Sequence, residues 1–264
     1  GIIDSLSNSQ IININNSLFS IPSPHQISMV LIDQKIEYNA AILNSVQNTR
    51  NYSNSYKKAL NLGVYGADLG YVNLYERTQE ALMYFSVIKT LSQELSIINA
   101  FKKDTFERIE KNLTNQDSLL LLLSTSYQDI DIFLKSNKQE HTGVLIIAGG
   151  WIESMYLLSQ FAIKNKDKEL IARLGENKHP LGNLIKILSV YSENNRIYQT
   201  LVEKLIALEM IFQDVQTTYT YGNTEVMPEK KITKINSTTN ITIPEDVLNQ
   251  MAKEIESIRQ FVIS

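Results

Sequence analysis

The chain has 264 residues, a formal net charge of -3 at pH 7 and a pI near 5.7. It therefore offers no basic field for a phosphate backbone, and we expect no nucleic-acid partner. Hydrophobic residues at 43% and charged residues at 20% are typical of a folded globular protein and not of a disordered one. The absence of cysteine excludes disulfides, thiolate nucleophiles and cysteine-based metal sites, and it leaves the redox compartment open.

The beginning of the chain indicates a processed N-terminus. The first residue is Gly rather than Met, and residues 1–20 are rich in Ser and Asn without clear periodicity. We interpret residues 1–20 as a flexible tether, of the kind that follows a signal peptide or a lipidation site. An ordinary frayed end has the same composition.

Residues 21–264 are predicted to form a single, mainly α domain of about eight helices, because helical spacing dominates and glycine and proline are sparse. Ser23-Pro24-His25-Gln26 resembles a helix start, so a first helix is predicted to run to about Gln47. A long helical region follows at 55–96, interrupted near Tyr75. Further helices are predicted at about 98–112, 116–134, 138–164, on either side of "GENKHPLG" (175–182), and at 195–217.

A change of pattern near residue 217 predicts a β-hairpin or β-arm before the last helix. Thr217, Tyr219 and Tyr221, then Ile232 and Ile235, alternate with polar residues, so residues 217–240 form an arm inserted in the helical domain. The capping-box pattern of 242–245 then opens a final helix to about Phe261.

An approximate internal repeat is a further possibility. At an offset of 85 residues, Leu60 matches Leu145, Asp68 faces Glu153 and Tyr71 matches Tyr156, while few positions between them agree. Chance agreement between helical sequences is the alternative.

Two small-residue clusters predict a close helix crossing. On a helix, Gly63, Gly66 and Gly70 fall on one stripe, although each glycine in a helix costs about 1 kcal/mol relative to alanine. A closely approaching helix backbone would compensate, and Gly149 and Gly150 form the matching cluster in "IIAGGWIESMY". We therefore predict that these two helices cross in the centre of the fold.

Polar residues beside this crossing are the candidate ligand-binding site. Two carboxylic acids and several tyrosines would converge there, and a buried acid must find donors or take up a proton. A purely structural role, in which the acids fix the crossing, is the alternative. The candidate residues are Asp68, Tyr71, Tyr75, Trp151, Glu153, Tyr156 and Gln160.

No known catalytic, metal or cofactor motif stands out. His25, His141 and His179 have no metal-binding spacing, so no metal site is predicted. "GVYGADLG" lacks the Lys-Ser/Thr ending of a phosphate loop, and no GxSxG elbow is present. Asp129 and Asp131 are two residues apart and would point to different helix faces. We predict no cofactor and assign no catalytic residue.

The segments "NLGVYGADLGYVNLYE" and "IIAGGWIESMYLLSQ" together resemble a family of uncharacterised, predominantly helical bacterial proteins that carry lipoprotein or secretory signals. The resemblance covers about an eighth of the chain. It implies an all-helical fold and a cell-envelope location, periplasmic or outer-membrane-anchored, with a lipid anchor upstream; a cytoplasmic location is the alternative. It implies no reaction, and the chain itself shows no lipobox.

The function predicted from these observations is binding of a small ligand or an envelope protein, through the groove beside the two glycine-containing helices or through the β-arm. One alternative is an enzyme that uses Asp68 and Glu153 as a general acid/base pair, which requires both carboxyl groups in an open cleft. Another is a structural scaffold with an exposed apolar interaction face. No membrane-spanning segment is expected, because the uncharged runs at 118–128 and 142–152 have 11 residues each, against about 20 for a membrane helix.

Overall fold

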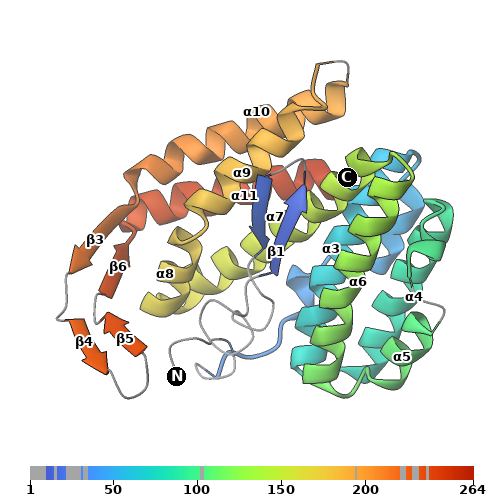
Figure 1. The fold of residues 1–264 in the computed structure, drawn as a ribbon, viewed down its shortest axis with the longest axis horizontal. Coiled ribbons are helices and arrows are strands. Elements are labelled where there is room, and N and C mark those ends of the chain that lie inside the picture. Colours follow the sequence, from blue (N-terminus) through green and yellow to red (C-terminus); the bar gives the residue numbers. More distant parts are fainter. Residues whose placement is uncertain are drawn as a thin grey trace.

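The structure is a computed structural model that describes residues 10–14, 17–21, 31, 35–101, 104–193, 195–220, 224–227, 232–235 and 238–264. It is a mainly α bundle, as predicted (Figure 1). The helices are α3 (Ser55–Leu74), α4 (Thr78–Glu94), α5 (Thr105–Lys111), α6 (Gln116–Ser136), α7 (Glu140–Asn165), α8 (Lys168–Gly175), α9 (Lys178–Ser189), α10 (Arg196–Ile211) and α11 (Glu245–Ile263). Short 3-10 helices are η1 (Ala40–Ile42), η2 (Val46–Asn51), η3 (Ile98–Ala100) and η4 (Phe212–Asp214).

Several helix starts follow from local capping. The side chains of Asn54, Asn115 and Asn195 accept hydrogen bonds from backbone N–H groups in the first turns of α3, α6 and α10. These N–H groups have no partner inside their helix, so an amide or carboxylate side chain in front of the helix stabilises its start. The predicted interruption near Tyr75 is present, since α3 ends at Leu74 and α4 begins at Thr78.

Helix α7 is the central element of the bundle. It packs against α3 and α11 and also against α6, α8 and α9 (Figure 1). Its residues from Gly143 to Ser159 are all buried. Among the described helices, α7 alone is long and apolar enough to cross a membrane by length and composition, and 94% of its apolar window is buried inside the protein. This helix therefore has the burial of a core helix.

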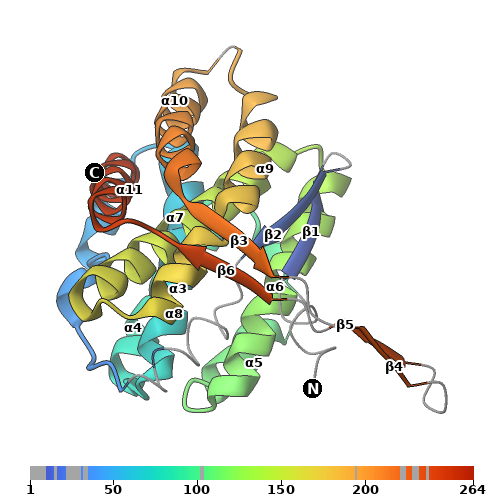
Figure 2. The ribbon, with the colours of Figure 1, turned by 90° about the vertical axis from the view of Figure 1, so that its left-hand side faces the viewer.

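The predicted β-arm is a ribbon built from two successive strand pairs. β3 (Gln216–Thr220) pairs antiparallel with β6 (Thr238–Thr242), and β4 (Thr224–Met227) pairs antiparallel with β5 (Ile232–Ile235). In the register, Gln216 lies opposite Thr242 and Thr224 opposite Ile235. Figure 2 shows the β4–β5 end projecting away from the helices. The base of the ribbon lies against α8, where Ile241 contacts the position of Gly175.

The N-terminal prediction needs two corrections. Residues 10–21, placed in a flexible tether, contain an antiparallel pair of strands, β1 (Gln10–Ile14) and β2 (Ser17–Ile21), and β2 contacts α9. Strand-forming Ile and Phe residues are frequent here, and Ile14 pairs with Ser17 across a two-residue connection. The predicted helix to Gln47 is also wrong over residues 35–47, which contain η1 and the start of η2 but no α-helix. Its predicted start, with His25, lies outside the described residues.

Three smaller differences concern helix ends. The predicted helix 98–112 consists of η3 and the separate α5. Pro180 lies within the first turn of α9 and does not precede that helix, which is tolerated because a proline there removes no helical hydrogen bond. The capping box at Thr242 does not form, because Thr242 pairs with Gln216 in the ribbon and α11 begins later, after Pro244.

Candidate functional site: a buried polar layer beside the helix crossing

Helices α3 and α7 touch backbone to backbone at two glycines. A Cβ atom placed on Gly63 would lie 2.6 Å from the backbone nitrogen of Gly150 and closer still to the carbonyl oxygen of Ile146. A Cβ atom on Gly149 would lie 2.7 Å from the carbonyl carbon of Leu60 and closer still to its oxygen. Only glycine fits at these two positions, because the neighbouring atoms are helix backbone and cannot move aside. Of the other predicted crossing residues, Gly70 and Gly150 are buried and Gly66 is half-buried.

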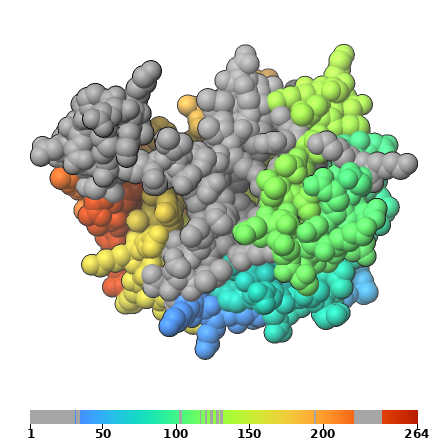
Figure 3. Space-filling view, turned by 60° about the horizontal axis from the view of Figure 1, so that its bottom comes forward, coloured from blue at the N-terminus to red at the C-terminus, as the bar shows by residue number. Residues whose placement is uncertain are grey.

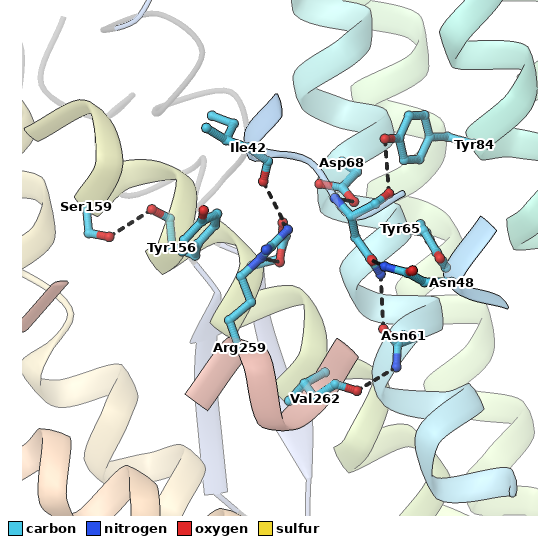
Figure 4. Close-up of polar contacts among 12 residues, drawn as sticks. Ile42, Asn48, Asn61, Tyr65, Asp68, Tyr84, Tyr156, Ser159, Arg259 and Val262 are labelled. Carbon is cyan, nitrogen blue, oxygen red and sulfur yellow. Dashed lines mark hydrogen bonds and ion pairs between the residues drawn. The ribbon is translucent and has the colours of Figure 1, made fainter. Parts of the chain in front are cut away.

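Beside this crossing lie the three charged side chains that are buried within the described part of the chain. Asp68 of α3 and Glu153 of α7 have no exposed surface, and Arg259 of α11 is 4% exposed. Figure 4 shows Asp68 and Arg259 on their helices. Arg259 forms a bidentate ion pair with Glu153, through Nε at 2.7 Å and through the second guanidinium nitrogen at 2.8 Å. The guanidinium also lies over the ring of Tyr156, 4.0 Å from its centroid. Glu153 is therefore fully paired.

Asp68 has a different environment from Glu153. Its Oδ2 atom accepts one hydrogen bond, from the backbone N–H of Asn44 at 3.2 Å, and its Oδ1 atom is buried without a conventional donor. Burial, reinforced by the neighbouring charge of Glu153, raises the pKa of Asp68 well above that of a free aspartate, although Arg259 opposes the shift. The nearby Glu153 carboxyl group thus favours the protonated form of Asp68, which makes Asp68 the acid of this layer that lacks a cation of its own.

The polar layer is covered by residues 36–52, which we call the docked segment. Figure 3 shows its blue surface beside the cyan surface of the following helices. Side chains from the bundle bond to its backbone: the Tyr75 and Tyr65 hydroxyls donate to the carbonyls of Ile36 and Ser45, and Arg259 donates to the carbonyl of Ile42 at 3.0 Å. The segment is thus held on the polar layer by hydrogen bonds from bundle side chains to its backbone.

Asn44 is the central residue of the docked segment. Its carbonyl accepts a hydrogen bond from the Tyr84 hydroxyl at 3.1 Å, and its N–H donates to Asp68 (Figure 4). Its buried amide nitrogen lies within hydrogen-bond distance of the Tyr52 hydroxyl and of Asn61 Oδ1. Backbone groups bonded in this way to side chains cannot form helical hydrogen bonds, which explains why residues 36–52 are not the predicted α-helix.

The candidate ligand-binding residues fall into separate groups. Asp68, Glu153 and Tyr156 come together with Arg259. The Tyr71 ring stacks with Tyr38 of the docked segment, and the Tyr75 ring lies tilted against Tyr38. The Tyr71 hydroxyl accepts a hydrogen bond from the Asn39 N–H. The two further candidates, Trp151 and Gln160, are not part of these groups: the Trp151 indole N–H donates to Asn177, between α8 and α9, and Gln160 is half-buried on α7.

The C-terminal helix is attached to the same wall of the bundle. The Lys57 ammonium donates to the carbonyl of Phe261, and Asn61 donates to the carbonyl of Val262 at 2.9 Å. Carbonyls in the last turn of a helix lack helical partners, so these two α3 side chains cap α11. Helix α11 is thereby held at two places, by this cap and by the ion pair of Arg259 with Glu153.

Within the described residues, no group of three or more His, Asp or Glu side chains is arranged to hold a metal ion. His141 is half-buried at the start of α7, where its carbonyl accepts a hydrogen bond from the Tyr198 hydroxyl. His179 is exposed in the first turn of α9.

Sequence reasoning missed Arg259 and the docked segment. A signal for Arg259 exists, since it lies between Ile258 and Val262 on the apolar side of the last helix, where a charged residue must be paired if it is buried. No comparable signal marks Asn44, because asparagine is common throughout this chain.

Comparison with known proteins adds no relative: no family model matches the chain, and no curated protein or solved structure is significantly similar to it.

Proposed function

We propose that this protein is a helical, partner-binding protein of the bacterial cell envelope, and that it engages another protein through the β-arm. The observation that carries the proposal is the exposure of the arm: all five residues of β3, Gln216–Thr220, are exposed. A strand exposed along its whole length contributes little to the core, so its side chains are available to a partner.

The geometry of the arm favours strand addition as the binding mode. Each strand of the ribbon pairs with one other described strand, so one edge of each strand has no strand partner among the described residues. Open strand edges present unpaired N–H and C=O groups that can accept an additional strand. Exposed Thr217, Thr218 and Tyr219 would supply side-chain contacts beside such a strand.

The groove beside the two glycine-containing helices supports a binding function less well. The docked segment already covers it, and the Asp68 and Glu153 carboxyl groups have no exposed surface. The same burial argues against the enzyme alternative, because a substrate cannot reach a sealed carboxyl pair. The envelope location rests on the resemblance of the two helix motifs.

Site-specific photo-crosslinking in the native host would test the arm. A photoreactive residue at Thr218 should trap one envelope protein, and replacing residues 221–237 by Asn-Gly should abolish binding of that purified protein. The matched control positions are Met210, 69% exposed on α10, and Leu121, 64% exposed on α6. Cross-links to one partner from these helix positions, and none from Thr218, would favour the scaffold alternative and refute the arm.

A further inference from the structure

We propose that a single proton, held by Asp68 against Glu153, keeps residues 36–52 docked on the bundle, and that its loss at alkaline pH releases this segment. The docked segment would then be a pH-sensitive strap between the N-terminal part of the chain and the helical body. The inference concerns a region distinct from the β-arm and does not depend on the proposed function.

The charges of the buried layer require this proton. Arg259 supplies one positive charge, and both of its bonding nitrogens are used by Glu153 at 2.7 and 2.8 Å. Asp68 is as deeply buried as Glu153 but receives one backbone N–H, at 3.2 Å. A second carboxylate here would be a buried charge without a cation, which costs several kcal/mol. A proton on Oδ1 removes the charge and gives this buried oxygen a partner in Glu153.

The tyrosines and the arginine that face Asp68 hold their protons over the same range. Burial raises the pKa of each neighbouring tyrosine, and hydrogen bonds to Glu153 together with the nearby acids raise the pKa of Arg259 despite its burial. Asp68 is thus the group in this layer that loses its proton as the pH rises. The facing groups are Glu153 and Tyr156 from α7, Arg259 from α11, Tyr52 after η2, Tyr84 from α4 and Tyr65 from α3 itself.

The docked segment is the cover most easily opened. The Asp68 carboxyl lies under Asn44, whose neighbours are in 3-10 or extended conformation and are held largely by side-chain hydrogen bonds. The other walls are the helices α3, α7 and α11, which pack through the core. When Asp68 ionises, admitting water costs least at this segment, which buries Ile36, Leu43 and Tyr52 but fewer residues than α3, α7 or α11. Segments with fewer buried contacts open at a lower free energy.

The sign of the pH effect follows from linkage. The folded protein binds the Asp68 proton more tightly than the unfolded chain does, so this contribution is complete below the unfolded pKa of about 3.9 and is lost as pH rises through the raised pKa of Asp68. Between those two values, the unfolding equilibrium constant of the native protein should rise by up to about tenfold per pH unit relative to Asp68→Asn. Asparagine copies the neutral acid and removes this dependence.

Spin labelling would test release directly, since the chain has no cysteine and one introduced cysteine can be labelled selectively. A label at Ala40→Cys, exposed in the docked segment, should become mobile as pH is raised above neutrality. The same label in an Asp68→Asn background should stay immobile at all these pH values. A control label at Lys253→Cys, exposed on α11, should remain immobile in both backgrounds.

Infrared spectroscopy of protein labelled with ¹³C-aspartate provides a test without substitution at Asp68. A carboxylic-acid C=O band that shifts with the isotope at neutral pH identifies a protonated aspartate, and this band should disappear over the pH range in which the Ala40 label becomes mobile. Absence of the band at neutral pH would refute the proposal. So would equal mobility changes with and without Asp68→Asn, an Ala40 label that stays immobile, or loosening of α11 in its place.

Discussion

The two layers on helices α3 and α7 are closed by opposite chemistry. At the crossing, Gly63 and Gly149 bring backbone atoms into direct contact, and no side-chain atom can be added. In the adjacent layer, Arg259 pairs with Glu153 and donates to the docked segment, and Asp68 accepts a hydrogen bond from the same segment. The packing at the crossing is therefore limited by the space between the two helix backbones. The packing of the polar layer is determined by its balance of hydrogen bonds and charges. The two layers should therefore respond differently to substitution.

The largest expected effect is at the crossing. Gly63→Ala should destabilise the protein by more than about 4 kcal/mol, because the new Cβ atom would clash with the backbone of Ile146 and Gly150. Urea denaturation measures the loss. Gly182→Ala is the matched control, since its Cβ would meet the flexible Glu209 carboxylate at 3.1 Å and the helix gains about 1 kcal/mol in propensity. Equal stability of the two variants would contradict the predicted close contact.

Removing the buried cation should have the next largest effect. Arg259→Met leaves Glu153 as an unpaired buried charge and should cost about 3 to 5 kcal/mol. The double variant with Glu153→Gln removes that charge and should recover part of the loss in the same urea titration. A double variant as unstable as the sum of both single variants would show that charge balance is not what specifies this layer.

Loss of one hydroxyl over the docked segment should have a smaller effect. Tyr84→Phe leaves the buried carbonyl of Asn44 without its donor and should cost about 1 to 3 kcal/mol. Hydrogen exchange should locate the loss in residues 36–52, with α7 unchanged. Exchange that increases equally in α7 would mean that the segment does not open on its own.

The smallest effect is expected for an exposed ion pair. Lys166 and Glu245 are 2.7 Å apart, but both side chains are 72% exposed. Lys166→Ala should leave the melting temperature unchanged, because water and salt screen such a pair. A loss comparable to that of Arg259→Met would remove the distinction between buried and exposed pairs in this protein.

The helical part of the fold could be predicted because its signals are local. The spacing of apolar residues and the breaks in it predict the main helices, and α7 and α11 follow their predicted ranges closely. The docked segment shows where local signals fail. A capping pattern and apolar residues predict a helix to Gln47, but side chains of the bundle bond the backbone of residues 36–45 and hold it in another conformation.

The sequence by itself determined the helical class, the β-arm before the last helix, the two glycine clusters and the presence of two acids beside them. Tertiary structure alone decided how those acids are used. Arg259 lies 106 positions from Glu153 and 217 positions from Ile42 in the sequence, yet it bonds to both. No local sequence pattern can encode contacts over such separations. The protonation of Asp68 likewise depends on the groups that are buried beside it. The free energy of a charge is set by its neighbours and its solvent access, and not by its position in a helix.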